Sequence, residues 1–144
     1  MDNNRIKDLR EDNFYTQEYV ADMINLTRSA YSKYELNIRS VPLDVLFRIA
    51  SLYEVSIDYI CGIKDKREVK VYSNEFNYQK LTDNLIRIRK EKGYSQEDLS
   101  KKVSSAQNTI SEYENGTRKV SIEFLILLSK IYDTTLDYLM GLEG

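Results

Sequence analysis

The chain has 144 residues, which is enough for one medium-sized domain or two small ones. Hydrophobic residues make up 42% and charged residues 31%, with one Pro and five Gly, a composition typical of a packed globular protein. The absence of His and the single Cys exclude a Ser-His-Asp or Cys-His triad, a Cys/His zinc site and an internal disulfide. The formal net charge is only −2, so the placement of the charges matters more than their sum.

The apolar residues are spread along the sequence in short runs. The longest continuous run, residues 124–128, is far shorter than the ~20 residues needed to cross a bilayer. The first five residues carry no apolar segment. We therefore expect a cytoplasmic protein with no membrane partner.

An internal repeat determines the organisation of the chain. Shifting the sequence lays residues 5–65 over residues 84–144 without a gap. Copies of about 61 residues are marginally stable alone, so packing between them or a homodimer would help. We predict a first domain at 1–65, a linker at 66–78 and a second domain at 79–144. Identical pairs include Arg10 and Arg89, Tyr15 and Tyr94, Gln17 and Gln96, Glu35 and Glu114, and Arg39 and Arg118.

Each copy is predicted to form five short helices, so the expected fold class is all-α, with two tandem five-helix domains and a short linker. In the second copy, Ser95 opens a helix with Asp98 three residues later, in a capping-box pattern. Further helices are expected over about residues 107–114, 122–132 and 136–142.

Residues 69–72 of the linker alternate apolar and polar side chains, as a short strand does. Two interpretations are open at this point. The segment is either a coil that tethers the domains or an edge strand that pairs with another chain.

The stretch from Ser95 to Arg118 combines two short helices, a tight polar turn, and Gln, Asn and Ser at exposed positions of the second helix. This is the pattern of a helix-turn-helix, whose second helix can enter the major groove of DNA. With the trailing residues 55–62 and 134–141, both copies resemble the lambda-repressor-like helix-turn-helix family of phage repressors and bacterial regulators.

The resemblance implies double-stranded DNA as the partner. It implies that Gln17 and Gln96 hold a phosphate and steady a base-reading side chain. By the same resemblance, the residues facing bases or nearby phosphates are Gln107, Asn108, Ser111 and Glu112 in the second copy and Arg28, Ser29, Ser32 and Lys33 in the first. The loop that grips the DNA backbone is matched by Asn115, Thr117, Arg118 and Lys119, with Arg39 in the first copy.

The repeated pairs of Arg10 with Glu35 and Arg89 with Glu114 invite a catalytic interpretation. The family instead places them as an ion pair between the first and third helices, which fixes geometry without chemistry. We therefore expect no enzyme, no cofactor, no metal and no small-molecule ligand.

The charges differ between the copies. Residues 84–119 hold eight basic and five acidic residues, whereas residues 5–40 hold six of each and sum to zero. Because phosphate neutralisation supplies most non-specific affinity, the second domain is expected to bind DNA more strongly.

Both copies depart from the family pattern at one point. In the second copy, Ser104-Ser105-Ala106 occupies the turn, and Ser105 is the candidate helix cap there. In the first copy, Leu36-Asn37-Ile38 replaces the polar backbone-gripping loop.

The leading hypothesis is a sequence-specific regulator, a repressor, that inserts the third helix of one or both domains in the major groove. In a second hypothesis only the second domain binds DNA, and the first is a protein-interaction or dimerisation module. A third hypothesis is an antirepressor-like protein that binds another regulator, which fits the sequence pI of about 5.3.

Overall fold

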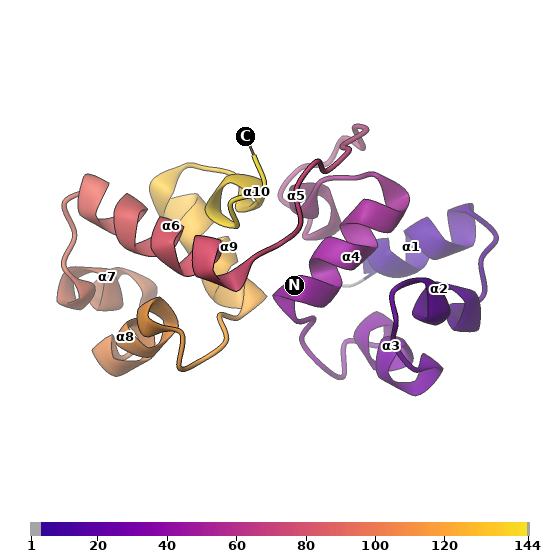
Figure 1. The fold of residues 1–144 in the computed structure, drawn as a ribbon, viewed down its shortest axis with the longest axis horizontal. Coiled ribbons are helices and arrows are strands. Elements are labelled where there is room, and N and C mark those ends of the chain that lie inside the picture. The colour runs from indigo at the N-terminus through magenta and orange to yellow at the C-terminus, as the bar shows by residue number, and fades with distance from the viewer. Residues whose placement is uncertain (1–3, 144) are drawn as a thin grey trace. The chain divides into compact units, whose positions relative to one another are not determined.

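A computed structural model describes residues 4–143, and the chain divides between Ser73 and Asn74 into two compact helical units (Figure 1). Apart from one isolated antiparallel bridge, the regular secondary structure of the described residues is helical. The all-α fold class predicted from the sequence is therefore confirmed. The first unit contains α1 (Asn4–Asp12), α2 (Gln17–Met23), α3 (Arg28–Glu35), α4 (Leu43–Tyr53) and α5 (Ile57–Ile60).

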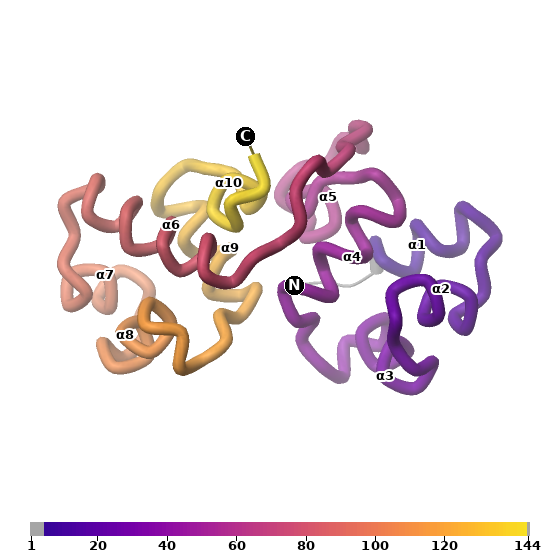
Figure 2. The backbone as a smooth tube through the Cα atoms, viewed as in Figure 1, coloured from indigo at the N-terminus to yellow at the C-terminus, as the bar shows by residue number. Residues whose placement is uncertain are grey.

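The second unit repeats this order of elements, and the backbone can be followed through both units in Figure 2. Its first helix is longer than α1, and the other four have similar lengths to their counterparts. These elements are α6 (Tyr78–Glu91), α7 (Gln96–Val103), α8 (Gln107–Asn115), α9 (Ile122–Tyr132) and α10 (Leu136–Leu139).

Local chemistry explains where α7 and α8 begin and end. The Ser95 hydroxyl accepts from the Asp98 amide at 3.0 Å, and the Asp98 carboxylate accepts from the Ser95 amide at 3.0 Å, which completes the predicted capping box. Helix α8 ends at Asn115, and the following cap residue, Gly116, has a left-handed φ of 81° that suits a residue without a Cβ. The last helix, α10, ends at Leu139, earlier than the predicted 142.

The expectation that Ser105 caps α8 is wrong. The residue in the cap position is Ala106, with extended φ and ψ of −66° and 144°, and no side chain accepts a hydrogen bond there. Ser104 takes a left-handed φ of 54° at the end of α7, as the equivalent Asn25 does in the first unit with φ of 60°, so both turns have the same geometry. In the first unit, Thr27 occupies the equivalent position and its hydroxyl accepts from the Ala30 amide.

The cores place α3 and α8 so that one face of each stays in solvent. Helices α4 and α9 bury the most residues among the described helices of their units, and Leu46 and Leu125 at equivalent positions are fully buried. Tyr31 of α3 and Ile110 of α8, also equivalent, are fully buried as well. Each of these helices is thus anchored by its inner face and leaves its outer face in solvent.

The strand-like end of the linker packs on the first unit. Val69 forms an antiparallel bridge with Val55, and the Tyr72 hydroxyl accepts from the Ile57 amide at 3.2 Å and donates to the Val55 carbonyl at 3.3 Å. The Tyr72 ring lies edge-on to Phe47, with centroids 5.4 Å apart. Apart from this one bridge the segment 69–72 is irregular, so it is a coil anchored to its own unit, and pairing with another chain stays a prediction.

Every helix among residues 4–143 is too short, or too polar, to pass through a bilayer.

Candidate nucleic-acid interface

The outer face of α8 brings together the four side chains predicted to read bases in the second unit. Gln107 and Asn108 are exposed, and Ser111 and Glu112 are half-buried one turn further along. Because positions four apart share a helix face, these side chains form one surface, opposite the buried Ile110.

Helix α3 has the same arrangement in the first unit with different chemistry. Arg28 and Ser29 are exposed, and Ser32 and Lys33 are half-buried. Arg prefers guanine in the major groove, whereas Gln and Asn prefer adenine. The outer faces of two equivalent helices of one chain thus carry different side-chain chemistry.

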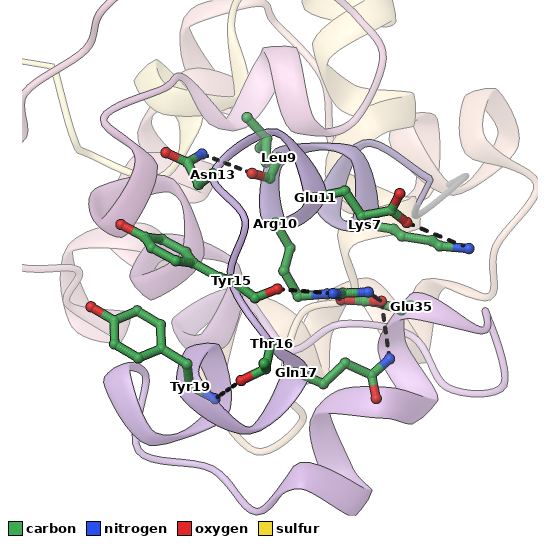
Figure 3. Close-up of polar contacts among 10 residues, drawn as sticks. All are labelled: Lys7, Leu9, Arg10, Glu11, Asn13, Tyr15, Thr16, Gln17, Tyr19 and Glu35. Atoms are coloured by element: carbon green, nitrogen blue, oxygen red, sulfur yellow. Dashed lines mark hydrogen bonds and ion pairs between the residues drawn. The ribbon is translucent and has the colours of Figure 1, made fainter.

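In the first unit, a two-pronged ion pair joins α1 to the end of α3. The Arg10 guanidinium donates to Glu35 through Nε at 2.7 Å and Nη2 at 3.0 Å, and its Nη1 donates to the Tyr15 carbonyl at 3.1 Å (Figure 3). The Gln17 amide donates to the same carboxylate at 3.1 Å. The pair therefore fixes the positions of α1, α2 and α3 relative to one another.

The second unit repeats this network almost atom for atom. Arg89 donates to Glu114 at 2.7 and 3.0 Å and to the Tyr94 carbonyl at 2.8 Å, and the Gln96 amide donates to Glu114 at 3.1 Å. The Arg89 and Glu114 side chains are only 10% and 7% exposed. The sequence indicated the ion pair but not its link to Gln96.

Acid should weaken this network in the first unit. Burial opposes ionisation of the Glu35 carboxyl, but the hydrogen bonds from Arg10 and Gln17 outweigh it and hold the pKa of Glu35 below its usual range. A carboxyl whose folded-state pKa is lowered stabilises the fold above its unfolded-state pKa of ~4.3, and this contribution is lost as pH falls through the folded-state value.

We therefore expect the wild type to be more stable than Glu35→Gln by the largest amount near neutral pH. This difference should shrink below about pH 4. Thermal unfolding of both proteins from neutral to acidic pH measures this. Glu11→Gln is the control, because it removes a carboxylate from an exposed pair with Lys7 and leaves the Arg10–Glu35 hydrogen bonds in place. A constant difference between wild type and Glu35→Gln at every pH would contradict the assignment.

The loop after α8 is held together by its own polar side chains. The Asn115 amide oxygen accepts from the Thr117 amide at 2.9 Å and from its hydroxyl at 2.7 Å. Glu112 and Arg118, both predicted to face DNA, bind one another, with 2.6 Å between Arg118 Nε and Glu112 Oε2. Neither this pair nor the contact of Lys119 with the Tyr78 ring, at 3.7 Å, was indicated by the sequence.

The pair of Glu112 and Arg118 should restrain DNA binding. Glu112→Gln removes a negative charge from the α8 face and frees the Arg118 guanidinium for a phosphate. We expect this variant to bind DNA more tightly at low salt. The slope of its log affinity against log salt concentration should be steeper by about one, the value of one added phosphate contact. Titration of double-stranded DNA at several salt concentrations measures both. Unchanged affinity and salt slope would show that Arg118 contacts no phosphate, and Glu91→Gln on α6 is the control, as Glu91 holds Arg87 in a similar exposed pair.

The equivalent loop of the first unit is apolar. Leu36 and Ile38 are 64% and 69% exposed at the positions of Asn115 and Thr117, and Arg39 is the exposed cation beside them. Further exposed apolar residues in this unit have polar or Gly counterparts in the second: Phe14, Tyr19 and Met23 correspond to Gly93, Asp98 and Lys102. The two units therefore share a fold and differ in surface chemistry.

Comparison with known proteins agrees with this geometry. The sequence profile of the helix-turn-helix family matches residues 6–60 and again 85–139, together more than half of the chain. The chain belongs to the helix-turn-helix family. The tandem organisation and the resemblance to the lambda-repressor-like type are thereby confirmed.

Similar proteins occur in Bacillus subtilis (strain 168). The chain is 40% identical over 67 residues to the uncharacterized HTH-type transcriptional regulator YobD, covering 46% of this chain and 60% of YobD. It is 29% identical over 107 residues to the HTH-type transcriptional regulator ImmR, covering 71% and 84%. The match to the HTH-type transcriptional regulator AnsR is 38% over 61 residues, covering 42% and 53%. The chain thus spans little more than half of YobD and AnsR. No solved structure gives a significant match.

Proposed function

We propose that this helix-turn-helix chain is a sequence-specific, double-stranded DNA-binding transcription regulator that acts as a repressor in the cytoplasm, without catalytic activity. The observation that carries the proposal is the outer face of α8, where Gln107 and Asn108 are exposed and Ser111 lies one turn away on the same surface. Gln and Asn can each make two hydrogen bonds to adenine in the major groove. The names of the similar proteins support the same class of function.

In this proposal α8 enters the major groove and the flanking residues hold the phosphates. The Gln96 amide nitrogen carries two N–H groups, so it can donate to a phosphate while it stays bonded to Glu114. Because Glu114 also holds Arg89, Gln96 is oriented before DNA arrives. Arg118 and Lys119 lie exposed in the loop after α8 and supply positive charge to the DNA backbone.

A second candidate function concerns the first unit alone, as a protein-interaction or dimerisation module beside a DNA-binding second unit. Two observations favour it. The segment 5–40 has no net charge, and Leu36 and Ile38 expose apolar surface where the second unit has polar residues. Apolar surface binds protein better than it binds phosphate. The length of the DNA footprint distinguishes the candidates. A chain that binds DNA through both units protects two half-sites, and a chain that binds through one unit protects a single half-site.

The test is selection of bound fragments from random double-stranded DNA by the intact chain at two salt concentrations. Enrichment of a recurrent sequence supports the proposal, and a split motif indicates that both units read DNA. A single half-site favours the second candidate function for the first unit. No enrichment at either salt concentration would refute DNA reading and favour the antirepressor-like alternative, in which the partner is another regulator.

A further inference from the structure

The first residue of α6 contacts the loop after α8. The Lys119 ammonium nitrogen lies 3.7 Å from the centroid of the Tyr78 ring, well within the ~6 Å of a cation–π interaction. Tyr78 precedes the repeated part of the sequence, which begins at Asn84, and the residue equivalent to Lys119 in the first unit is Ser40. The first unit therefore has no counterpart of this contact in its sequence.

The Tyr78 ring is a fixed platform. It belongs to a helix of 14 residues whose N-cap, Asn77, accepts from the Lys80 amide at 3.1 Å. The Phe76 ring packs edge-on against it, with centroids 4.8 Å apart. An ammonium group above such a ring loses freedom that an exposed lysine otherwise keeps.

The contact lies beside a hollow of about 280 Å³ between the start of α6 and the loop after α8. Arg118 and Lys119 both line this hollow, and Tyr78 lines it from the opposite element. Arg118 is engaged by Glu112 at 2.6 Å. The partner of Lys119 is a neutral ring, so this contact does not neutralise the lysine's positive charge.

We propose that Tyr78 is a positioning residue of the DNA interface, whose ring holds Lys119 in place to meet a backbone phosphate. The inference rests on the proposed function, because it assigns a role within the same interface. A lysine ordered before binding loses less side-chain entropy when the phosphate arrives. The contact thus adds to the stronger DNA binding that the second unit is expected to have from its excess of basic residues.

A double-mutant cycle on the full chain tests this, with Tyr78→Leu, Tyr78→Phe, Lys119→Ala and Tyr78→Leu/Lys119→Ala titrated on one DNA at several salt concentrations. We expect Tyr78→Leu to weaken binding about two- to five-fold and Tyr78→Phe, which keeps the ring, to match the wild type. Lys119→Ala should lower the salt slope by about one. In the Lys119→Ala background, Tyr78→Leu should have no further effect.

Two results would overturn the inference while the proposed function stands. One is wild-type affinity in Tyr78→Leu, and the other is an equal loss with and without Lys119, which indicates a general structural role. Failure of the wild type to bind any DNA would instead refute the proposed function itself.

A measurement without DNA checks the contact directly. The ring current of Tyr78 should shift the Lys119 Hε proton signals upfield in the wild type and in Tyr78→Phe, and this shift should vanish in Tyr78→Leu. Its absence in the wild type would overturn the inference whatever the binding data show. Circular dichroism of each variant confirms that the helices remain.

Discussion

Replacing Gln107 and Asn108 together by Ala is expected to abolish the preference of the chain for its selected DNA sequence while the fold stays intact. Both side chains are exposed on α8, and the core contact of this helix comes from Ile110 on the other face. Each good two-bond contact with a base gives about 1–3 kcal/mol of discrimination. The double variant should therefore lose about 2–6 kcal/mol of specificity if both residues make one.

Competitive titration of the selected sequence against a scrambled duplex measures this loss. The non-specific, salt-dependent affinity should survive, because Arg118 and Lys119 are untouched. Arg28→Ala/Ser29→Ala changes the same two positions in the first unit and shows whether α3 also contributes to selectivity. Undiminished selectivity in the α8 variant would refute base reading by this helix, and loss only in the α3 variant would transfer that role to the first unit.

Removing the carboxylate of the buried ion pair in the second unit should destabilise it severely. Glu114→Ala leaves the Arg89 guanidinium without its partner in a site where its side chain is only 10% exposed. Breaking such a pair by removing one member typically costs about 3–5 kcal/mol, a large part of the total stability of a small domain. Urea unfolding followed by circular dichroism should show the loss as a lower midpoint for this unit.

Two further variants show that the loss comes from the unpaired charge. Glu97→Ala breaks only the exposed pair with Lys101 and should change stability by about 0.5 kcal/mol or less. Arg89→Met/Glu114→Leu removes both charges and should regain a good part of the loss, because no buried ion stays unpaired. If Glu114→Ala were as mild as Glu97→Ala, the pair would not be the structural link described here.

Much of the fold follows from local signals in the sequence. The capping box of Ser95 and Asp98 and the left-handed Gly116 fix helix ends through contacts within a few residues, so the pattern reveals them. The internal repeat predicts the second occurrence of every element from the first. The pairing of Arg89 with Glu114 was implied by the resemblance to the lambda-repressor-like family, and the repeat preserves both residues.

Contacts between distant segments could not be predicted in the same way. Tyr72 packs against Phe47, and Tyr78 against Lys119, across separations that no local pattern encodes. Ala106 takes the cap position although its side chain cannot accept a hydrogen bond, because the turn keeps the geometry of the first unit, where Thr27 is the cap. The linker and part of the candidate interface therefore became visible only in three dimensions.

The most direct test of the account is the ratio of the affinities of the intact chain for its selected sequence and for a scrambled duplex, measured over a series of salt concentrations. We expect both affinities to fall as salt rises, while the selected sequence binds about 10³-fold more tightly or better. A ratio near one at every salt concentration would contradict sequence-specific reading by α8.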